Sequence, residues 1–292
     1  MLFYALYVAG YWACVLLPRR FCYAVARRFA DLYSGRSPVD RESVRRNLSA
    51  VLERDPSDEE VREVFRHFGM YLVDFFRFSR LTRAKVDRWI RIEGLENMEA
   101  ALRKGKGAIG VTAHLGNYEL AGAVLALLGF PVYAAVFIHQ NSYVDAFFSR
   151  QRARVGVRVI PVQPNNFRAL FETSLSALKQ NGILALVGDR DFFDHGMELP
   201  FFGRTVKIPR GPAAFSLRTG APIVPGFLVR ENDSYRFVLE KPIEPIEGVP
   251  REEAARRMTQ AYVEVMSRTI RRYPTQWYLF QELGSTGPVV IH

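Results

Sequence analysis

The stretch that decides the fold covers residues 108–120 and reads AIGVTAHLGNYEL. Its first six residues are small or β-branched and uncharged, which is typical of a strand buried on both faces of a mostly parallel sheet. His114 stands where this strand should end. Gly116 and Asn117 are turn and helix-capping types, and Glu119 falls in the first turn of the helix that the following residues predict. The stretch therefore predicts a strand, a sharp turn and a helix.

This arrangement would place an imidazole and a carboxylate at the carboxyl edge of the sheet, where open α/β folds bind their ligands. A neutral imidazole can take a proton from an alcohol, and a carboxylate on its other ring nitrogen fixes the tautomer and stabilises the imidazolium. We therefore expect His114 to be the general base and Glu119 its orienting acid. Gly116 and Asn117 are candidates to support an oxyanion, together with the backbone amides of the turn, or to support the turn itself. The turn carries no serine or cysteine, so the nucleophile should come from the substrate.

The spacing alone fits equally well a core histidine beside an ordinary carboxylate at a helix N-terminus. The segment HLGNYEL (residues 114–120), however, resembles the first signature block of the bacterial late acyltransferases of lipid A biosynthesis. These belong to the wider glycerolipid acyltransferase group, whose hallmark is His-x4-Asp/Glu, here HX4E. Residues 150–156, 199–213 and 273–280 resemble the later blocks of that family, in family order. The resemblance favours a catalytic role for the histidine.

The family resemblance implies a mixed, mostly parallel central sheet flanked by helices. It also implies transfer of a fatty acyl group from acyl carrier protein or a coenzyme A thioester to a hydroxyl of a lipid or glycolipid, such as a lipid A precursor. We expect no cofactor and no metal. Two alternatives remain open: a thioesterase-like hydrolase that uses the same dyad with water, and a non-catalytic membrane protein that binds anionic lipid.

The second block ends in RQRARVG (residues 150–156), and the family has an important arginine two residues ahead of the glycine position. This points to Arg154, with Arg152 as the alternative register, although cations also suit any helix C-terminus. Asp189 and Asp191 end another apolar strand, where paired carboxylates could bind a metal. The intervening arginine and the family's Asp-x-Asp block favour an ion pair instead, so we expect Asp191 to hold Arg154.

The third block contributes three cations in what reads as a loop near the site. Arg204, Lys207 and Arg210 are candidates to bind phosphate of the acceptor lipid or of a pantetheine-bearing donor, the alternative being ordinary solvated charge. The fourth block departs from the family pattern: a histidine and an arginine–tryptophan pair usually follow its tryptophan, whereas this chain has FQELG (residues 280–284). That departure weakens a lipid A precursor as the acceptor.

The composition narrows the class of partner. The chain has 292 residues, of which 49% are hydrophobic, so it can bury a large core. Forty Lys and Arg against thirty Asp and Glu give a net charge of +10, which suits nucleic acid, an anionic membrane surface or acidic ligands. Zinc-ligand cysteine pairs, helix-turn-helix signals and aromatic ribonucleoprotein motifs are missing, which argues against nucleic acid. Cys14 and Cys22 read as reduced, small apolar fillers.

Residues 1–17 carry no charge and are followed by arginines at positions 19, 20, 27 and 28. This predicts a membrane-anchoring helix within residues 1–30, spanning or half-buried, with residues 31–292 as a single α/β acyltransferase domain. A cleaved signal would need a basic region before the apolar run, and a buried first helix of a soluble domain is the other alternative. By the positive-inside rule we expect these arginines, and with them the catalytic domain, on the cytoplasmic side. The family resemblance implies the same side of the inner membrane.

The remaining pattern fills in the sheet and its helices. Residues 235–240 should pair antiparallel with the strand before them, because the turn between the two is short. Strands are expected at residues 86–93, 131–137, 157–162, 183–191 and 220–229, and helices at 141–154, 167–179 and 251–272.

Overall fold

The structure is a computed structural model and describes residues 2–139, 141–163 and 166–285. A seven-stranded sheet lies at its centre, in the order β1-β9-β8-β2-β5-β3-β4. Strands β8, β2, β5, β3 and β4 run parallel, β9 pairs antiparallel with β8, and β1 pairs parallel with β9. The strands are β1 (Ile90–Glu93), β2 (Ala108–Thr112), β3 (Val132–Phe137), β4 (Arg158–Val162), β5 (Ile183–Val187), β8 (Ile223–Glu231) and β9 (Ser234–Leu239). The predicted fold class is confirmed.

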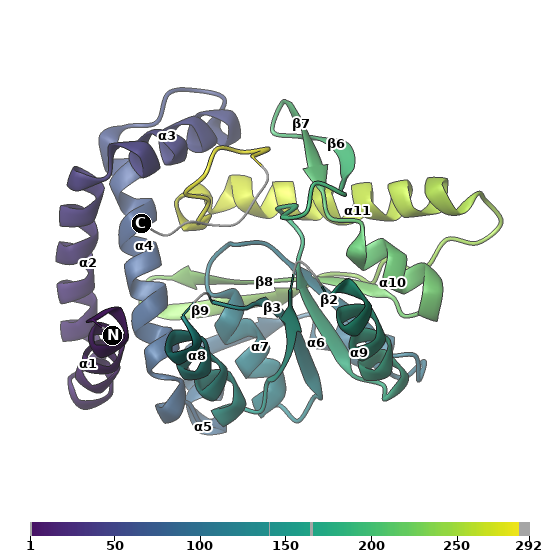
Figure 1. Ribbon diagram of the computed structural model, residues 1–292, viewed down its shortest axis with the longest axis horizontal. Coiled ribbons are helices and arrows are strands. Elements are labelled where there is room, and N and C mark those ends of the chain that lie inside the picture. The colour runs from purple at the N-terminus through teal and green to yellow at the C-terminus, as the bar shows by residue number, and fades with distance from the viewer. Residues whose placement is uncertain (1, 140, 164–165, 286–292) are drawn as a thin grey trace.

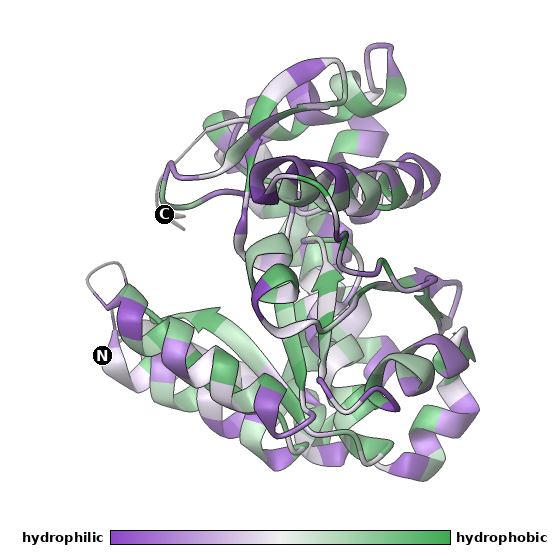
Figure 2. Ribbon diagram, turned by 90° about the vertical axis from the view of Figure 1, so that its right-hand side faces the viewer, coloured by the Kyte–Doolittle hydropathy of each residue, from purple (hydrophilic) through white to green (hydrophobic). Residues whose placement is uncertain are grey.

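Helices cover both faces of this sheet (Figure 1). Alternate residues of β8 show why: Val224 and Leu228 pack into one apolar cluster, and Ile223 and Phe227 pack into another on the opposite face. In Figure 2 the central strands are hydrophobic along most of their length, whereas hydrophobic and hydrophilic residues alternate along the helices. The helices are α1 (Leu2–Leu16), α2 (Arg19–Arg36), α3 (Pro38–Leu52), α4 (Asp58–Phe76), η1 (Phe78–Arg80), α5 (Arg83–Trp89), α6 (Leu95–Leu102), α7 (Tyr118–Leu127), α8 (Ser142–Arg154), α9 (Phe167–Lys179), α10 (Gly211–Thr219), α11 (Arg251–Arg272) and η2 (Pro274–Gln276).

Two expectations about these elements are wrong. The predicted strand at residues 86–93 is helix α5 for its first half, because Val86 and Trp89 bury one side of a single helical turn. The expected cationic loop at residues 199–213 is largely an antiparallel hairpin of β6 (Met197–Phe201) and β7 (Arg204–Ile208). Its side chains alternate between buried and more exposed along β6 and β7, and the prolines in and after these short strands hide that period in the sequence.

The apolar N-terminal run forms α1, and Pro18 separates it from α2. Among the residues that the structure describes, we find no helix that is both long and apolar enough to cross a bilayer. Helices α1, α2 and α4 stand together at one end of the molecule (Figure 1). Both forms of the predicted anchor, spanning and half-buried, stay predictions.

A buried ionic cluster joins α2 and α4 to the sheet. The Asp74 carboxylate of α4 is 8% exposed and accepts hydrogen bonds from Arg19 Nε (3.0 Å), Tyr23 Oη (2.6 Å) and one guanidinium nitrogen of Arg230 (2.7 Å). The hydroxyl of Tyr235 donates to it as well. Burial alone would raise the pKa of Asp74, but the two arginines and these hydrogen bonds hold it below its ordinary value.

We expect Asp74→Asn to lower the free energy of unfolding by about 3–5 kcal/mol at neutral pH, because Arg19 and Arg230 would lose their buried counter-charge. Since the folded pKa lies below the unfolded value of about 4, this contribution is present above about pH 4 and is lost as the pH falls through the folded pKa. Urea unfolding at pH 7 and pH 3 should therefore show a difference that shrinks in acid. Asp233→Asn is the control, since its ion pair with Arg20 is exposed. An equal loss in both variants would contradict the assignment.

Candidate functional site

The turn after β2 is held by a close backbone contact with β8. Gly116 adopts a φ of 63°, and a Cβ atom there would lie 2.1 Å from the carbonyl oxygen of Leu228, so only glycine fits. Asn117 is the N-cap of α7, and its Oδ1 accepts a hydrogen bond from Leu120 N at 2.9 Å. The predicted strand, turn and helix thus form as expected, with His114 at the end of the strand.

The carboxylate that contacts the imidazole is Asp189. His114 Nδ1 lies 2.8 Å from Asp189 Oδ1, and because a carboxylate only accepts, Nδ1 carries the proton. Asp189 Oδ2 accepts from His114 N at 3.0 Å and from Trp277 Nε1 at 2.9 Å. The Asp189 side chain is fully buried, whereas that of His114 is 22% exposed. The geometry leaves Nε2 as the nitrogen that can act as a base.

Sheet register explains this pairing. Strands β2 and β5 are parallel neighbours in which Thr112 is opposite Val187, so the residues two positions further along come side by side beyond the strand ends. Gly188 N donates to Thr112 O at 2.8 Å and continues the pairing up to the site. Burial alone would raise the pKa of Asp189, but His114 and the three hydrogen bonds hold it below its ordinary value. The carboxylate is therefore ionised when the imidazole becomes charged.

Glu119 does not contact the imidazole, so its predicted place as the orienting acid is wrong. Its carboxylate forms a two-pronged ion pair with Arg152 of α8, at 3.0 Å from Nε and 2.6 Å from the terminal nitrogen. Phe75 and Phe148 flank the guanidinium. The first turn of α7 directs the Glu119 carboxylate toward α8. The acid that contacts His114 is Asp189, which follows β5. Of the two arginines that the second block offered, the alternative, Arg152, is therefore the one that lies at the site.

The expected ion pair between Arg154 and Asp191 is not formed. The guanidinium of Arg154 donates to the Tyr11 hydroxyl at 2.8 Å and to Gln151 Oε1 at 3.3 Å, because the end of α8 packs against α1. The Asp191 carboxylate instead accepts from the backbone of its own loop, from Phe193 N at 3.1 Å and from the N–H of residue 196. Asp191 thus shapes the loop after β5.

The three cations of the third block each pair with a different carboxylate. Arg204 lies 3.0 Å from Glu282, Lys207 lies 2.7 Å from Asp194, and Arg210 lies 2.9 Å from Glu252. The structure therefore does not gather them into one anion site, and phosphate binding stays a prediction. Glu282 belongs to the segment that departs from the family's fourth block, and it also pairs with an arginine of α3. The departing segment therefore has a structural role here.

Most backbone N–H groups of the turn donate hydrogen bonds within the protein. Gly116 N donates to Gln276 O at 2.8 Å and Asn117 N donates to Leu228 O at 2.7 Å, so neither points toward a substrate oxygen. Of the two expected roles of Gly116, support of the turn agrees with its positive φ and its close contact with β8, and the oxyanion role has no free backbone N–H here. The side chain of Asn117 is buried, and no described residue accepts from its Nδ2. Oxyanion support by this amide stays a prediction.

Two aromatic rings contact the imidazole, and further rings pack behind one of them. Tyr118 of α7 and Phe192 lie edge-on to the His114 ring, with centroids 5.4 and 6.4 Å away. Phe192 in turn packs on Phe137 at the end of β3, at 4.2 Å, and Phe193 packs on Phe137 at 5.4 Å. These surroundings suit a substrate with an apolar chain. Phe137 ends β3, and Phe192 and Phe193 follow β5, so these rings lie at the carboxyl edge of the sheet, where the fold places its ligands.

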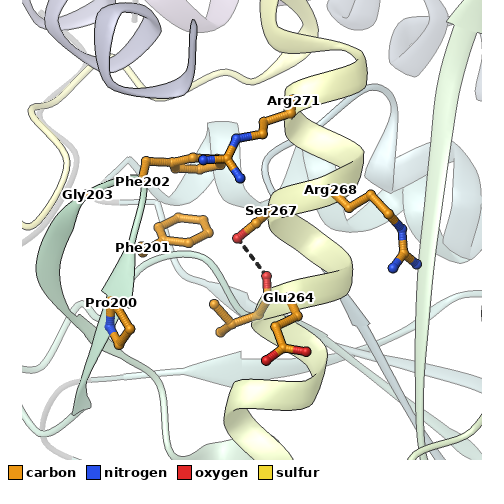
Figure 3. Close-up of a pocket in the computed structure, with 9 residues that line it drawn as sticks. Pro200, Phe201, Phe202, Gly203, Glu264, Ser267, Arg268 and Arg271 are labelled. Carbon is orange, nitrogen blue, oxygen red and sulfur yellow. Dashed lines mark hydrogen bonds between the residues drawn. The ribbon is translucent and has the colours of Figure 1, made fainter. Parts of the chain in front are cut away.

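A cavity of about 420 Å³ lies between the β6–β7 hairpin and α11 (Figure 3). It is lined by Phe201, Phe202, Arg268 and Arg271 among others, and by none of the predicted site residues. Its phenylalanines connect it to the site, since both rings pack against Trp277. Within the described ranges, no cluster of three His, Cys, Asp or Glu side chains could hold a metal ion.

Sequence reasoning missed Asp189 as the partner of His114 and missed Trp277 as the partner of Asp189. The signal for Asp189 was its place at the end of an apolar strand, but the sequence does not reveal that β5 is the neighbour of β2. The signal for Trp277 was the fourth block itself, whose role only the three-dimensional arrangement shows.

Comparison with known proteins identifies the relatives of this chain. The family model of bacterial lipid A biosynthesis acyltransferases matches residues 1–283. The phosphatidylinositol mannoside acyltransferase of Mycobacterium tuberculosis (strain CDC 1551 / Oshkosh) is 28% identical over 284 residues, which cover 94% of this chain and 86% of the relative. The lipid A biosynthesis palmitoleoyltransferase of Escherichia coli (strain K12) is 28% identical over 258 residues, covering 85% and 80%. The crystal structure of the 1-acyl-sn-glycerophosphate acyltransferase PlsC from Thermotoga maritima superposes with a TM-score of 0.41 and 14% identity, over 89% of this chain and 99% of the other.

Proposed function

Because this chain belongs to the bacterial lipid A biosynthesis acyltransferase family and is an O-acyltransferase that acts on a lipid acceptor, we propose that it uses His114 to activate a hydroxyl of a glycolipid. The acyl donor in this proposal is a fatty acyl thioester of acyl carrier protein or of coenzyme A. The observation that carries it is the hydrogen-bonded pair of His114 and the buried Asp189, just beyond the ends of β2 and β5.

The chemistry follows from the tautomer of the imidazole. With its Nδ1–H on Asp189, His114 presents the lone pair of Nε2 to the acceptor hydroxyl and takes its proton. The alkoxide oxygen bonds to the thioester carbonyl carbon, the carbon–sulfur bond then breaks, and the leaving thiolate takes the proton from Nε2. The negative charge of Asp189 stabilises the imidazolium between these two steps. Every atom of the ester product comes from the two substrates, so a covalent acyl-enzyme is not required.

Glu119 has a different part in this proposal. Its ion pair with Arg152 joins the first turn of α7 to α8, and the hydroxyl of Tyr118 beside it accepts a hydrogen bond from the Tyr71 hydroxyl of α4 at 3.1 Å. We infer that this buried network fixes the start of α7 and, through it, the position of the His114 ring. The acid of the HX4E motif then acts through the scaffold and not on the imidazole.

The acceptor in this proposal is a membrane lipid that carries a sugar and a free hydroxyl. We choose it because it is the lipid chemistry that the two kinds of relative share. The test incubates the purified chain with palmitoyl-coenzyme A or palmitoyl-acyl carrier protein and either a phosphatidylinositol mannoside or a lipid A precursor. Mass spectrometry then follows the lipid products. A mass gain of one palmitoyl group on either lipid supports transfer, and the active donor identifies the carrier. Accumulation of free palmitate alone would instead support the hydrolase.

We further propose that α1 and α2 lie in the membrane interface and place the domain on the cytoplasmic side of the inner membrane. Exposed apolar side chains recur along one side of α2 at helical spacing, with exposed arginines beside them. Such a helix can bury its apolar side in the acyl boundary while the arginines reach lipid phosphates. The exposed apolar residues of α1, α2 and the link between them are Leu6, Trp12, Leu16, Leu17, Phe21, Val25, Phe29, Leu32 and Tyr33.

Replacing two of these residues should weaken membrane binding. Phe21 and Phe29 are 54% and 67% exposed, and we expect Phe21→Asp with Phe29→Asp to reduce partition onto anionic vesicles about tenfold or more. Sedimentation with phosphatidylglycerol-containing vesicles measures this. Phe171→Asp is the matched control, since Phe171 is 41% exposed on α9. An equal loss in the control, or unchanged partition in the double variant, would contradict the proposed surface.

A further inference from the structure

The segment Gln276–Trp277–Tyr278, here called the C-terminal clasp, pairs with the turn that carries the imidazole. Tyr278 N donates to His114 O at 2.7 Å, and Gly116 N donates to Gln276 O at 2.8 Å. Leu115 and Trp277 therefore form an isolated antiparallel bridge. The clasp thus bonds the backbone on both sides of Leu115, directly after His114.

The clasp is itself tied down on two sides. The Gln276 side chain accepts from Arg230 N at 2.8 Å and donates to Arg230 O at 2.9 Å, which fixes it to β8. His67 of α4 donates through Nδ1 to Thr275 O at 3.0 Å, just before the clasp. The clasp thus has a fixed position relative to the sheet and to α4.

Trp277, the central residue of the clasp, also contacts the Asp189 carboxylate. Its side chain is 3% exposed, and the rings of Phe201 and Phe202 pack against it at 6.0 and 5.5 Å. Figure 3 shows these two phenylalanines on the hairpin side of α11. The indole Nε1–H donates to Asp189 Oδ2, the same oxygen that accepts from His114 N. Two donors on Oδ2 leave Oδ1 alone to face the imidazole.

We propose that Trp277 is a positioning residue of the acyl transfer, whose indole N–H holds the Asp189 carboxylate so that its free oxygen stays on His114 Nδ1. This inference rests on the proposed role of His114 as the base. Without the indole donor, the carboxylate can rotate about its last bond, and the imidazole loses its fixed orientation. A purely structural role of Trp277 would need only the volume of the ring, not its N–H.

The test removes the N–H and keeps the shape. Trp277→Phe removes both the donor and part of the ring, and site-specific replacement of Trp277 by 3-benzothienylalanine puts sulfur in place of the N–H in a ring of nearly equal size. We expect both chains to lose kcat by about 10- to 100-fold with KM unchanged, which is the effect of one hydrogen bond to a charged group at a residue that does not touch substrate. The probe is palmitoyl transfer from palmitoyl-coenzyme A to a phosphatidylinositol mannoside in vesicles.

A second measurement, which needs no substrate, tests independently whether Trp277 holds the contact between Asp189 and His114. In chains labelled with ¹⁵N-histidine, the Nδ1–H proton of His114 should give a downfield resonance that His114→Ala removes. We expect this resonance to shift or broaden in the benzothienylalanine chain and to be unchanged in Trp89→Phe, the control, whose tryptophan lies on α5. An unchanged resonance or wild-type kcat in the benzothienylalanine chain overturns the inference. If His114→Ala also transfers at the wild-type rate, it is the proposed function that fails.

Discussion

We expect His114→Ala to transfer acyl groups about 10²- to 10⁴-fold more slowly than the wild-type chain, with the fold unchanged. The reason is that no other group in the site replaces Nε2 as acceptor for the hydroxyl proton, since Asp189 is fully buried and bonded to three donors. The measurement is the initial rate of palmitoyl transfer followed by mass spectrometry, with thermal unfolding to check the fold.

His195→Ala is the matched control for this variant, since His195 is exposed in the loop before β6. It should transfer at the wild-type rate. A His114→Ala chain that folds normally and keeps near-normal transfer would refute the assignment of the base. A chain that loses transfer but still binds lipid vesicles would separate catalysis from membrane binding.

The second large effect is expected in Asp189→Asn. His114 N and Trp277 Nε1 both donate to one side of this carboxylate, so the asparagine should turn its oxygen toward them and its NH₂ toward the imidazole. The ring must then accept at Nδ1 and carry its proton on Nε2, the wrong tautomer for a base. We expect kcat to fall about 10²- to 10⁴-fold, as for loss of the base itself.

Glu119→Gln separates the two acids. The glutamine keeps a hydrogen bond to Arg152 but leaves its buried charge unpaired, so thermal stability should fall while transfer per folded molecule falls less than in Asp189→Asn. Initial rates and unfolding curves of both variants provide the comparison. If Glu119→Gln abolishes transfer and Asp189→Asn spares it, the orienting acid is Glu119 after all.

Much of the fold could be predicted from the sequence because its central strands and the helix at residues 251–272 have strong local patterns. Each of these signals lies within a short window: uncharged runs for strands buried on both faces, and apolar residues at helical spacing for α11. The turn at Gly116 and the cap at Asn117 were predictable for the same reason. The hairpin of β6 and β7 was not, because its prolines read as a loop.

The site could be predicted only in part. His114 was identified by its place at a strand end and by the family resemblance, both of which are local. Its partner was assigned wrongly because the nearest acid in the sequence is Glu119, whereas the nearest in space follows β5. Strand order is a property of the whole sheet and leaves no mark in the residues around one turn. The same holds for Arg154, whose partner on α1 lies far away in the sequence.

The contact between the C-terminal clasp and the turn at His114 also has a consequence for biosynthesis. The ribosome releases Gln276, Trp277 and Tyr278 long after it has released His114 and the turn that they hold. A nascent chain whose first helices already touch lipid would still lack the residues that hold its imidazole in place. The base should accordingly gain its working orientation only once translation has passed this segment.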